Sequence, residues 1–406
     1  MPYPTFTTVN YYAGSRLNRV SWLRSSSDFL NRAVVSPHAR FVLLDNGNPV
    51  IHSTDAKVLR LALFSWADVS AAVLRGVAAF GGSRVFGPDA YALEHGSGVE
   101  KYWQRATEGI ASPEANVVFL GIDEAQPRGV GNAAEPDGVP LFAAAIEGAF
   151  RDEVLAGPYQ VLDMRTVVIT GSLDAGDAAL VSQARALLDW HARYVYCPSC
   201  GSRQYPVWGG HKRACGGSLT ALAKDAPFVQ RLGAKPAICP STTSVQNYGY
   251  PRSDPVVIVG ILSRDNERLL LSRQKAWPPG LYSCVAGFVE QGESLEEAVR
   301  REAYEEAGVD IQTVAYHSSQ PWPFPANLII GAYGIATSSD TRLDLDRELE
   351  DAFFATRDEV LALVARNKDG SPTRNGNRVY IPGPSAIAHV LMAGWASGAA
   401  TVPGKL

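Results

Sequence analysis

The sequence lacks a strong excess of charge of either sign. Its 406 residues include 41 acidic and 37 basic side chains, which gives a formal net charge of −4. Such a chain has no general field that attracts polyanions, so any contact with nucleic acid has to be local and site-specific. Charged residues make up 19% of the chain and apolar residues 46%. This composition excludes a disordered or fibrous protein and predicts a globular one with a large core.

Long apolar runs are also missing. No stretch reaches the length of a membrane-spanning helix, and the first residues, "MPYPTFTTVNYYAGS", lack the basic start and apolar run of a secretory signal. We therefore expect an intracellular protein without a membrane contact. The last three residues, "GKL" at 404–406, resemble a peroxisomal tripeptide of the small-basic-Leu type. A peroxisomal and a cytoplasmic location both stay open.

Cysteine is scarce, with five residues in the whole chain. Because the expected compartment is reducing, Cys197, Cys200, Cys215 and Cys239 are interpreted as thiols or metal ligands rather than disulfides. Cys197 and Cys200 form a CxxC pair, a geometry that lets two thiolates turn onto one tetrahedral ion, and the other two could complete a four-sulfur zinc site. Such a site leaves no open position for water, so the zinc would be structural. Cys284, in "LYSCVAGF", is expected to be a small core residue.

Two alternatives to zinc stay open for the cysteines. A redox pair is one, but a redox CxxC usually opens a helix, whereas "CPSCGSRQYP" is rich in turn residues. Unligated thiols are the other. His211 lies between the cysteines and could replace one of them as a ligand; with four thiols available, we expect it to be a surface histidine.

The length of the chain favours two or three domains over a single core. We expect an N-terminal α+β domain at residues 1–193, without a catalytic signature of its own, and a small zinc-ribbon-like module at 194–250. A catalytic domain follows at 251–395, and residues 396–406 form a C-terminal tail. The module is placed where Gly, Pro and paired Cys residues interrupt the periodic pattern. No internal repeat is present.

Apolar patterns predict the main elements of these domains. The runs "ARFVLLD", "NVVFLGI" and "RTVVITG" are β-rich and bounded by Asp, Asn or Gly, so we expect buried strands. The segment "DAALVSQARALLDWHARYV" has apolar residues at helical spacing and predicts a long amphipathic helix with Asp177 as its N-cap. The catalytic domain is expected to contain strands near 255–263, 267–273 and 327–336, and helices near 295–306 and 384–395.

The stretch "GFVEQGESLEEAVRREAYEEAGV", at residues 287–309, concentrates glutamates within a few turns of chain. It is either an ordinary solvated helix or a site for something positive. Ser294 and Glu297 have the spacing of a capping box, so the helix should begin at Leu295. Gly308 suits the left-handed residue just past its end.

The helical wheel favours the second interpretation. Glu302, Glu305 and Glu306 fall within roughly a third of the circumference, in the sector of the apolar Leu295 and Val299. The opposite side, with Glu296, Glu297, Arg300 and Tyr304, makes a conventional solvated face. Clustered carboxylates repel one another and are costly to desolvate unless cations compensate them. Mg²⁺ and Mn²⁺ are the ions that suit such carboxylates. Because these ions commonly bind phosphate oxygens as well, we expect a diphosphate as the substrate.

The same stretch resembles the complete Nudix box, with Gly287, Glu293, Arg301 and Gly308 at the structural positions. Downstream, "SQPWPFPANL" at 319–328 is similar to the SQPWPFP signature of the NADH pyrophosphatase branch of Nudix hydrolases, with Asn327 where Ser is usual. The CxxC module with its lead-in "LLDWHARYVYCPSCG" also resembles that branch, so the resemblance covers most of the chain. The long gap between the last two cluster cysteines looks more like fungal members than like the compact bacterial zinc ribbon.

The resemblance implies roles for the box residues. It implies that Glu302, Glu305 and Glu306 bind the divalent metals and that Glu306 activates the attacking water. Glu348 and Ala286 match further metal-binding positions, although Glu348 could also be a surface carboxylate in an acidic run. Arg301 would hold the carboxylates through an ion pair with Glu293.

The resemblance also implies substrate contacts. The matching positions are Phe288, Tyr250, Gln320, Trp322 and Ala388. The two aromatics would stack on the nicotinamide end, or they could simply be core residues. Gln320 and Trp322 would shape the nucleotide pocket, and Ala388 would offer a backbone contact on the phosphate side.

The implied fold of the last domain is an α/β/α sandwich with a mixed sheet. The implied activity is metal-dependent hydrolysis of the pyrophosphate of NADH and NAD⁺, which gives NMNH or NMN and AMP. Removal of NAD caps from the 5′ end of RNA is the first alternative, and a catalytically silent nucleotide sensor or scaffold is the second. Members of the family dimerise through the catalytic domain, so a homodimer is implied.

Overall fold

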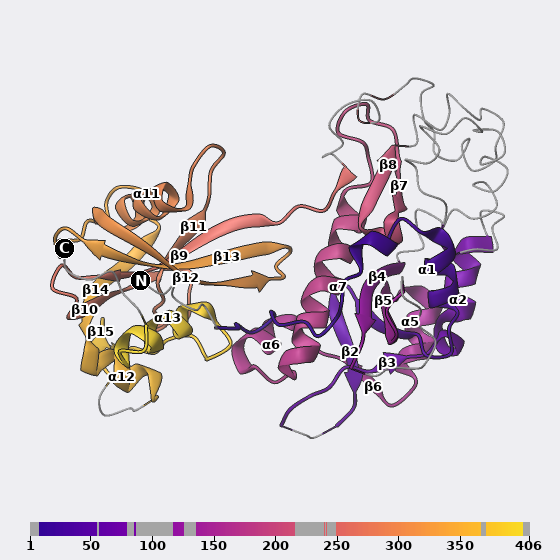
Figure 1. The fold of residues 1–406 in the computed structure, drawn as a ribbon. Coiled ribbons are helices and arrows are strands. Elements are labelled where there is room, and N and C mark those ends of the chain that lie inside the picture. Colours follow the sequence, from indigo (N-terminus) through magenta and orange to yellow (C-terminus); the bar gives the residue numbers. More distant parts are fainter. Residues whose placement is uncertain are drawn as a thin grey trace. The chain divides into compact units, whose positions relative to one another are not determined.

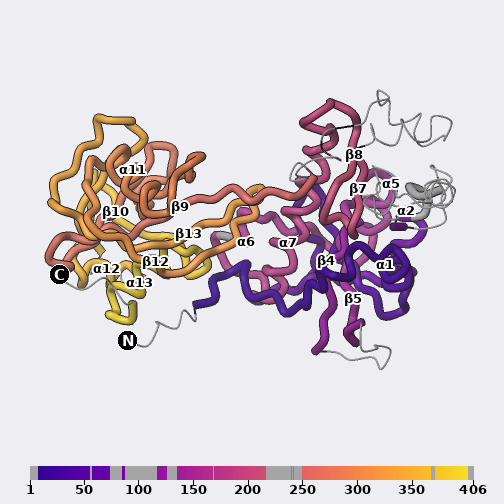
Figure 2. The backbone as a smooth tube through the Cα atoms, turned by 45° about the horizontal axis from the view of Figure 1, so that its top comes forward, coloured from indigo at the N-terminus to yellow at the C-terminus, as the bar shows by residue number. Residues whose placement is uncertain are grey.

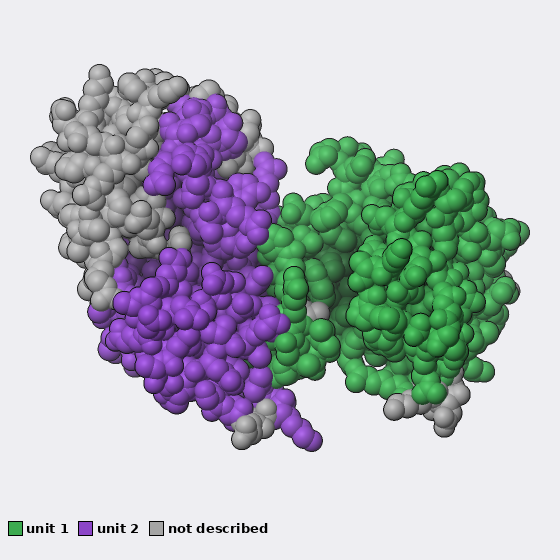
Figure 3. Space-filling model, turned by 180° about the vertical axis from the view of Figure 1, so that it is seen from behind, with its two compact units in different colours: residues 1–14, 165–179, 253–406 green, residues 15–164, 180–252 purple. Residues whose placement is uncertain are grey.

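The computed structural model describes residues 8–54, 57–78, 85–86, 117–125, 135–215, 239, 241, 249–366 and 371–400. The chain divides into two compact units, which Figure 3 distinguishes by colour. Unit 1 contains Met1–Gly14, Arg165–Ala179 and Ser253–Leu406, and unit 2 contains Ser15–Met164 and Leu180–Arg252. The domain limits expected from the sequence stay a prediction. Residues 404–406, which carry the expected import signal, lie outside the described residues.

None of the helices in the described residues combines the length and the apolar character that crossing a membrane requires.

Unit 2 contains a six-stranded sheet in the order β4-β5-β1-β2-β6, with β3 paired to β1. Only β1 and β5 are parallel; the other pairs are antiparallel. The strands are β1 (Arg40–Asp45), β2 (Asn48–His52), β3 (Leu63–Phe64), β4 (Val117–Asp123), β5 (Val139–Ala145) and β6 (Tyr159–Val161). β1 and β4 lie where the runs "ARFVLLD" and "NVVFLGI" predicted strands. Both are buried on nearly every residue, as near-continuous apolar runs require.

The core of unit 2 is built around stacked aromatic rings. The ring centroids of Phe41 and Phe142 lie 5.3 Å apart, and Phe119 lies 5.3 Å from Phe142. Short helices in this unit are η1 (Ser21–Leu23), α1 (Ser27–Val34), α2 (Trp66–Ala78) and α5 (Gly148–Leu155). α1 begins where the Ser26 side chain accepts a hydrogen bond from the Phe29 amide.

Two expectations for residues 165–193 need correction. The run "RTVVITG" forms the helix α6 (Met164–Thr170) and no strand. Met164 and Val167 are buried whereas Ile169 is 72% exposed, which is the spacing of a helix. In an apolar run this short, the sequence pattern does not distinguish the period of a helix from that of a strand. The helix α7 (Ala175–Arg193) forms as predicted, but its cap is Asp174, whose Oδ1 accepts from the amides of Gly176 and Asp177.

Unit 1 contains a second six-stranded sheet, in the order β12-β13-β9-β10-β14, with β11 paired to β9. β9 and β13 are parallel and the other pairs antiparallel, so the sheet is mixed. The strands are β9 (Asp254–Leu262), β10 (Arg268–Gln274), β11 (Val285–Phe288), β12 (Ile311–Trp322), β13 (Asn327–Ala336) and β14 (Leu349–Thr356). The three strands predicted in this region, β9, β10 and β13, are confirmed.

Helices cover both faces of this sheet (Figure 1). α11 (Leu295–Ala307) packs its buried residues into one apolar core with the sheet, and α12 (Arg357–Val364) and α13 (Ile387–Ala396) pack into the other. Cys284 lies in the core beneath α13, as predicted. A small ribbon, β15 (Thr373–Arg374) and β16 (Asn377–Arg378), precedes α13. The expected α/β/α sandwich with a mixed sheet is therefore confirmed.

The residues after α7 form a hairpin of β7 (Gln204–Val207) and β8 (Lys212–Cys215), joined by the turn η2 (Trp208–Gly210) (Figure 2). The expectation of a surface His211 is wrong. The residue is buried, and its Nε2 lies 2.6 Å from the carbonyl oxygen of Phe119 in β4. Packing of the hairpin turn against β4, a contact distant in sequence, buries this ring.

Candidate active site and metal centres

The acidic helix α11 begins and ends where its sequence predicts. The Ser294 side chain accepts from the Glu297 amide at 3.3 Å, and Glu297 Oε2 accepts from the Ser294 amide at 2.7 Å. This reciprocal pair is the predicted capping box, and it satisfies two amides that have no partner inside the helix. Gly308 ends the helix with a left-handed φ of 66°. Local chemistry thus fixes the rotation of α11 and the direction of its glutamates.

The buried sector of α11 is narrower than the wheel predicted. Glu302 and Glu306 are buried, with 9% and 3% exposure, whereas Glu305 is exposed. Glu305 lies at the edge of the sector, where the helix no longer faces the sheet, so its predicted role in metal binding stays a prediction. The solvated face is confirmed, since Glu296 and Tyr304 are exposed.

Arg301 connects the carboxylates of the box. Its guanidinium binds Glu293 through two hydrogen bonds of 2.6 and 2.9 Å, which confirms the predicted ion pair. It also donates to Glu302 Oε1 at 2.8 Å, to Glu305 Oε2 at 3.1 Å and to the carbonyl oxygen of Phe288 at 2.7 Å. The hydrogen bonds from Arg301 lower the pKa of Glu293 to about 2. Arg301 therefore ties the helix to β11 and orients Glu302.

Gly287 in β11 makes room for Glu302. A Cβ atom at this position would lie 2.0 Å from the Glu302 carboxylate. Only glycine allows the carboxylate to rest directly on the strand backbone. The next residue inward along β11 is Ala286, which pairs with Ile258 of β9.

Within the described residues, the Glu306 carboxylate forms no ion pair. Burial raises the pKa of Glu306 to about 8, and the negative charges of Glu302, Glu348, Asp346 and Glu305 act in the same direction. Burial also raises the pKa of Glu302, although Arg301 opposes this shift. Two buried carboxylates, Glu302 and Glu306, with this excess of negative charge have the donor chemistry that suits a hard divalent cation such as Mg²⁺ or Mn²⁺.

The two acidic residues before β14 whose charges act on Glu306 are Asp346 and Glu348. Glu348 is exposed; Gln274 donates to its Oε2 at 3.4 Å, and its own amide donates to Asp346 Oδ1 at 3.0 Å. The sequence resemblance had singled out Glu348 but missed Asp346. The acidic run "LDLDRELED" is a signal for both residues, but only the fold shows that it lies near α11.

A cavity of about 1010 Å³ opens on the face of the sheet that carries α12 and α13. Its lining includes three residues that the resemblance predicted to contact substrate, Gln320, Trp322 and Ala388, and also Ile258 and Ser283. Ile258 pairs with Ala286, the neighbour of Gly287, so the cavity and the carboxylates flank the same strand, β11. The volume is at the upper end of the range for small-molecule sites.

Gln320 builds the wall of this cavity. It is fully buried, and its Nε2 donates to the carbonyl oxygens of Tyr11 and Ser385 at 2.9 and 2.8 Å. Its Oε1 accepts from the amide of Ile387 at 3.0 Å, the first residue of α13. These bonds hold an N-terminal segment, β12 and α13 together. Because its amide is used in this way, Gln320 shapes the pocket through the backbone around it.

The two predicted stacking aromatics lie in different units. Phe288, at the end of β11, is 59% exposed. Tyr250 belongs to unit 2, where its ring lies 5.8 Å from Trp208 and the Nζ of Lys212 lies 5.5 Å from its centroid. Each ring is described within its own unit, and a shared stacking role stays a prediction.

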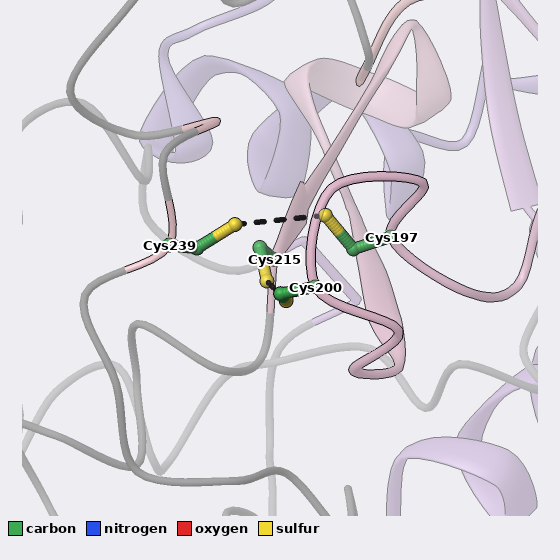
Figure 4. Close-up of side chains that lie close together, drawn as sticks. All are labelled: Cys197, Cys200, Cys215 and Cys239. Atoms are coloured by element: carbon green, nitrogen blue, oxygen red, sulfur yellow. Dashed lines mark hydrogen bonds between the residues drawn. The ribbon is translucent and has the colours of Figure 1, made fainter.

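The four predicted cysteine ligands come together in unit 2 (Figure 4). Their sulfur atoms all lie within 4.8 Å of one another, with Cys197 and Cys239 at 3.6 Å and Cys200 and Cys215 at 3.3 Å. A tetrahedral zinc with bonds of about 2.3 Å separates its sulfurs by about 3.8 Å. All four are free thiols, so the donor set and its spacing fit a zinc ion.

The CxxC pair is shaped by its own turn. The amide of Gly201 donates to the carbonyl oxygen of Cys197 at 2.8 Å, and the Cys197 amide donates to Ser202 at the same distance. Gly201 has a φ of +73°, which glycine adopts without strain. Cys215 comes from the end of β8.

Comparisons with known proteins agree with this geometry. The NUDIX domain model matches residues 252–375, and the model of the NADH pyrophosphatase-like rudimentary NUDIX domain matches residues 38–190. The NAD-capped RNA hydrolase of Schizosaccharomyces pombe is 37% identical over 89% of this chain and 87% of that protein. The human NAD-capped RNA hydrolase NUDT12 is 31% identical over 95% of this chain and 73% of that protein. The Saccharomyces cerevisiae NAD-capped RNA hydrolase NPY1 is 28% identical over 95% of both chains.

The chain therefore belongs to the Nudix hydrolases. Its second matched domain and its relatives place it in the NADH pyrophosphatase branch of that family, as the two sequence signatures indicated.

Proposed function

We propose that this enzyme hydrolyses the diphosphate of NADH and NAD⁺ to AMP and NMNH or NMN, with Mg²⁺ or Mn²⁺ as the catalytic ion. The observation that carries the proposal is a pair of buried carboxylates, Glu302 and Glu306, on one side of β11, with a cavity of about 1010 Å³ on the other. A dinucleotide matches both features: its diphosphate suits the carboxylates with their ion, and the apolar faces of its nucleosides suit the cavity.

Some residues of the site would bind the ion and the substrate, and one would accept a proton. Glu302 and Glu306 would hold a divalent ion, which would supply positive charge for the diphosphate and make a bound water more acidic. Arg301 keeps Glu302 in place through its contacts to Glu293 and the β11 backbone. Glu306 accepts the proton of the water that attacks phosphorus. The cavity walls exclude solvent from the bound nucleoside, and the exposed Phe288 ring offers a face for a base.

Removal of NAD caps from RNA is a second candidate function. It breaks the same bond in a larger substrate, and the three relatives described above are named for it. We also propose that the four cysteines bind a structural zinc ion. We further propose that the protein is a homodimer, which sedimentation analysis tests.

A panel of diphosphates tests the main proposal. We expect metal-dependent release of AMP from NADH, NAD⁺ and NAD-capped RNA, measured with Mg²⁺ and with Mn²⁺ in parallel. Nucleoside monophosphates serve as controls, because they contain no diphosphate. Failure to cleave any dinucleotide with either ion would refute the proposal, whereas a preference for another diphosphate would change only the substrate.

Replacing Gly287 with Ala tests how the carboxylates are placed. Because the new Cβ would meet the Glu302 carboxylate at 2.0 Å, we expect kcat/KM for NADH to fall by about 100-fold. A double-mutant cycle gives the control. In a Glu302→Ala background the clash partner is gone, so adding Gly287→Ala should cost little more. Fully additive losses would contradict the contact.

A further inference from the structure

Two arginines of unit 2, Arg19 and Arg24, lie on either side of the turn η1. Within the described part of the chain, no hydrogen bond or ion pair joins either guanidinium to another group, and the Nε of Arg24 is buried with no acceptor. Burial lowers the pKa of Arg24 to about 10, and the charge of Arg19 makes a smaller contribution in the same direction.

The acidic residues of the adjoining segment are already paired elsewhere. Asn18 and Ile122 are joined backbone to backbone, which brings β4 next to the start of this turn. The carboxylates that follow on β4 are Asp123, which accepts from Arg16 at 2.7 Å, and Glu124, which accepts from Asn18 at 2.8 Å. Neither compensates the arginine pair.

The neighbouring His211 adds no negative charge. Burial and the field of Arg24 lower its pKa to about 4, so the ring is neutral, and its Nε2 lies against the carbonyl oxygen of Phe119. Two guanidiniums on either side of one turn, one of them with a buried Nε that has no acceptor, favour the binding of an anion. This is the charge arrangement of a phosphate site.

An aromatic ring lies between the two arginines in the sequence. Trp22, in η1 (Ser21–Leu23), is 60% exposed, although tryptophan is normally among the more buried residues. Exposed aromatic rings interleaved with arginines are the elements with which proteins hold single-stranded nucleic acid: the cations bind the backbone and the ring stacks on a base. The chain as a whole is acidic, so a local site of this kind is what RNA binding requires.

We propose that Arg19, Trp22 and Arg24 bind single-stranded RNA, with the two guanidiniums on backbone phosphates and the indole on a base. The strand that follows an NAD cap is RNA of this kind. This inference rests on the proposed cleavage of NAD-capped RNA, and it assigns a role in substrate selection to unit 2.

Equilibrium binding of a fluorescent 20-nucleotide single-stranded RNA with a 5′-monophosphate, titrated at several KCl concentrations, tests the site. For the full-length Arg19→Ala/Arg24→Ala protein we expect about tenfold weaker binding, and a slope of log K against log salt that is smaller by about 1.4, or about 0.7 for each lost phosphate contact. Trp22→Ala should weaken binding by about fivefold or more with an unchanged slope. Arg193→Ala, which removes an exposed cation paired with Asp189 in the same unit, is the matched control and should bind like the wild type.

Turnover separates this proposal from the proposed function. The Arg19→Ala/Arg24→Ala protein should have the wild-type kcat/KM for free NADH and a lower kcat/KM than the wild type for NAD-capped RNA. Because Arg24 is partly buried, Arg19→Glu at the exposed position provides a second variant, and it should weaken RNA binding more than Arg19→Ala. Equal RNA affinity and salt slope in all variants would overturn the site. A wild-type protein that cleaves no dinucleotide would refute the proposed function instead.

Discussion

Replacing Glu306 with Gln is expected to lower kcat for AMP release from NADH by about 10³-fold or more. The substitution removes both a carboxylate ligand and the proposed proton acceptor, and general base catalysis alone contributes about 10²- to 10⁴-fold. Glu296→Gln is the matched control, since Glu296 lies on the exposed face of the same helix and should retain wild-type activity. Activity that survives Glu306→Gln would remove this residue from the mechanism.

The same substitution is expected to stabilise the protein when no divalent ion is added. Glu306 has a folded-state pKa of about 8 against an ordinary value of 4.5. Between these pH values the folded state binds more protons than the unfolded state, so stability falls as the pH rises through this window. Glutamine carries no charge to desolvate. Thermal unfolding of Glu306→Gln at pH 8.5 should therefore show a gain of the order of 2–4 kcal/mol over the wild type, and almost none at pH 4.5.

A loss of activity together with a gain of stability is specific to a site that stores unfavourable charge. If Glu306 had only a structural role, its substitution would lower the stability of the protein. Added Mg²⁺ or Mn²⁺ should reverse the order at pH 8.5, because the ion compensates the wild-type carboxylate. A wild-type protein that is more stable than Glu306→Gln at pH 8.5 without added ion would show that another group already neutralises Glu306.

Replacing Cys215 with Ser is expected to abolish zinc binding and to destabilise the protein by about 3 kcal/mol or more. Structural zinc contributes about 10–16 kcal/mol to the folding of small zinc domains, and much of that depends on a complete thiolate set. The cysteine cluster occupies the end of the β7–β8 hairpin, whose turn packs against β4, so its loss should spread into unit 2.

Metal analysis and thermal unfolding measure this prediction. The wild-type protein should contain one zinc per chain and Cys215→Ser almost none. Cys284→Ala is the control: this cysteine is also buried, but it lies in the core of unit 1, and its loss should leave the zinc content at one. Equal zinc content in wild type and Cys215→Ser would exclude the four-cysteine site.

Much of the catalytic helix could be predicted because its determinants are local. The Ser294–Glu297 capping box, the left-handed Gly308 and the ion pair between Arg301 and Glu293 involve residues within a few turns of chain. Strands β9 and β13 were equally predictable, since residues 257–262 and 331–334 are buried on both faces and form apolar runs.

The errors fall where contacts between distant residues decide the outcome. "RTVVITG" became α6 because its short apolar run fits two periods, and burial of Met164 and Val167 selects the helical one. His211 became buried because the η2 turn packs on β4, some ninety positions earlier. Glu305 became exposed because the sheet covers a narrower arc of α11 than the wheel assumes.

The sequence by itself determined which residues are the candidates for the chemistry, because the carboxylates of α11 and the cysteines are recognisable from their spacing. Only the tertiary structure decided their surroundings. The charges of Glu348 and Asp346, in the segment before β14, act on Glu306, Gln320 joins three segments around the cavity, and Cys239 lies beside the CxxC pair. The physical reason is that hydrogen bonds within a helix depend on neighbouring residues, whereas burial and electrostatic fields depend on every segment that the fold brings close.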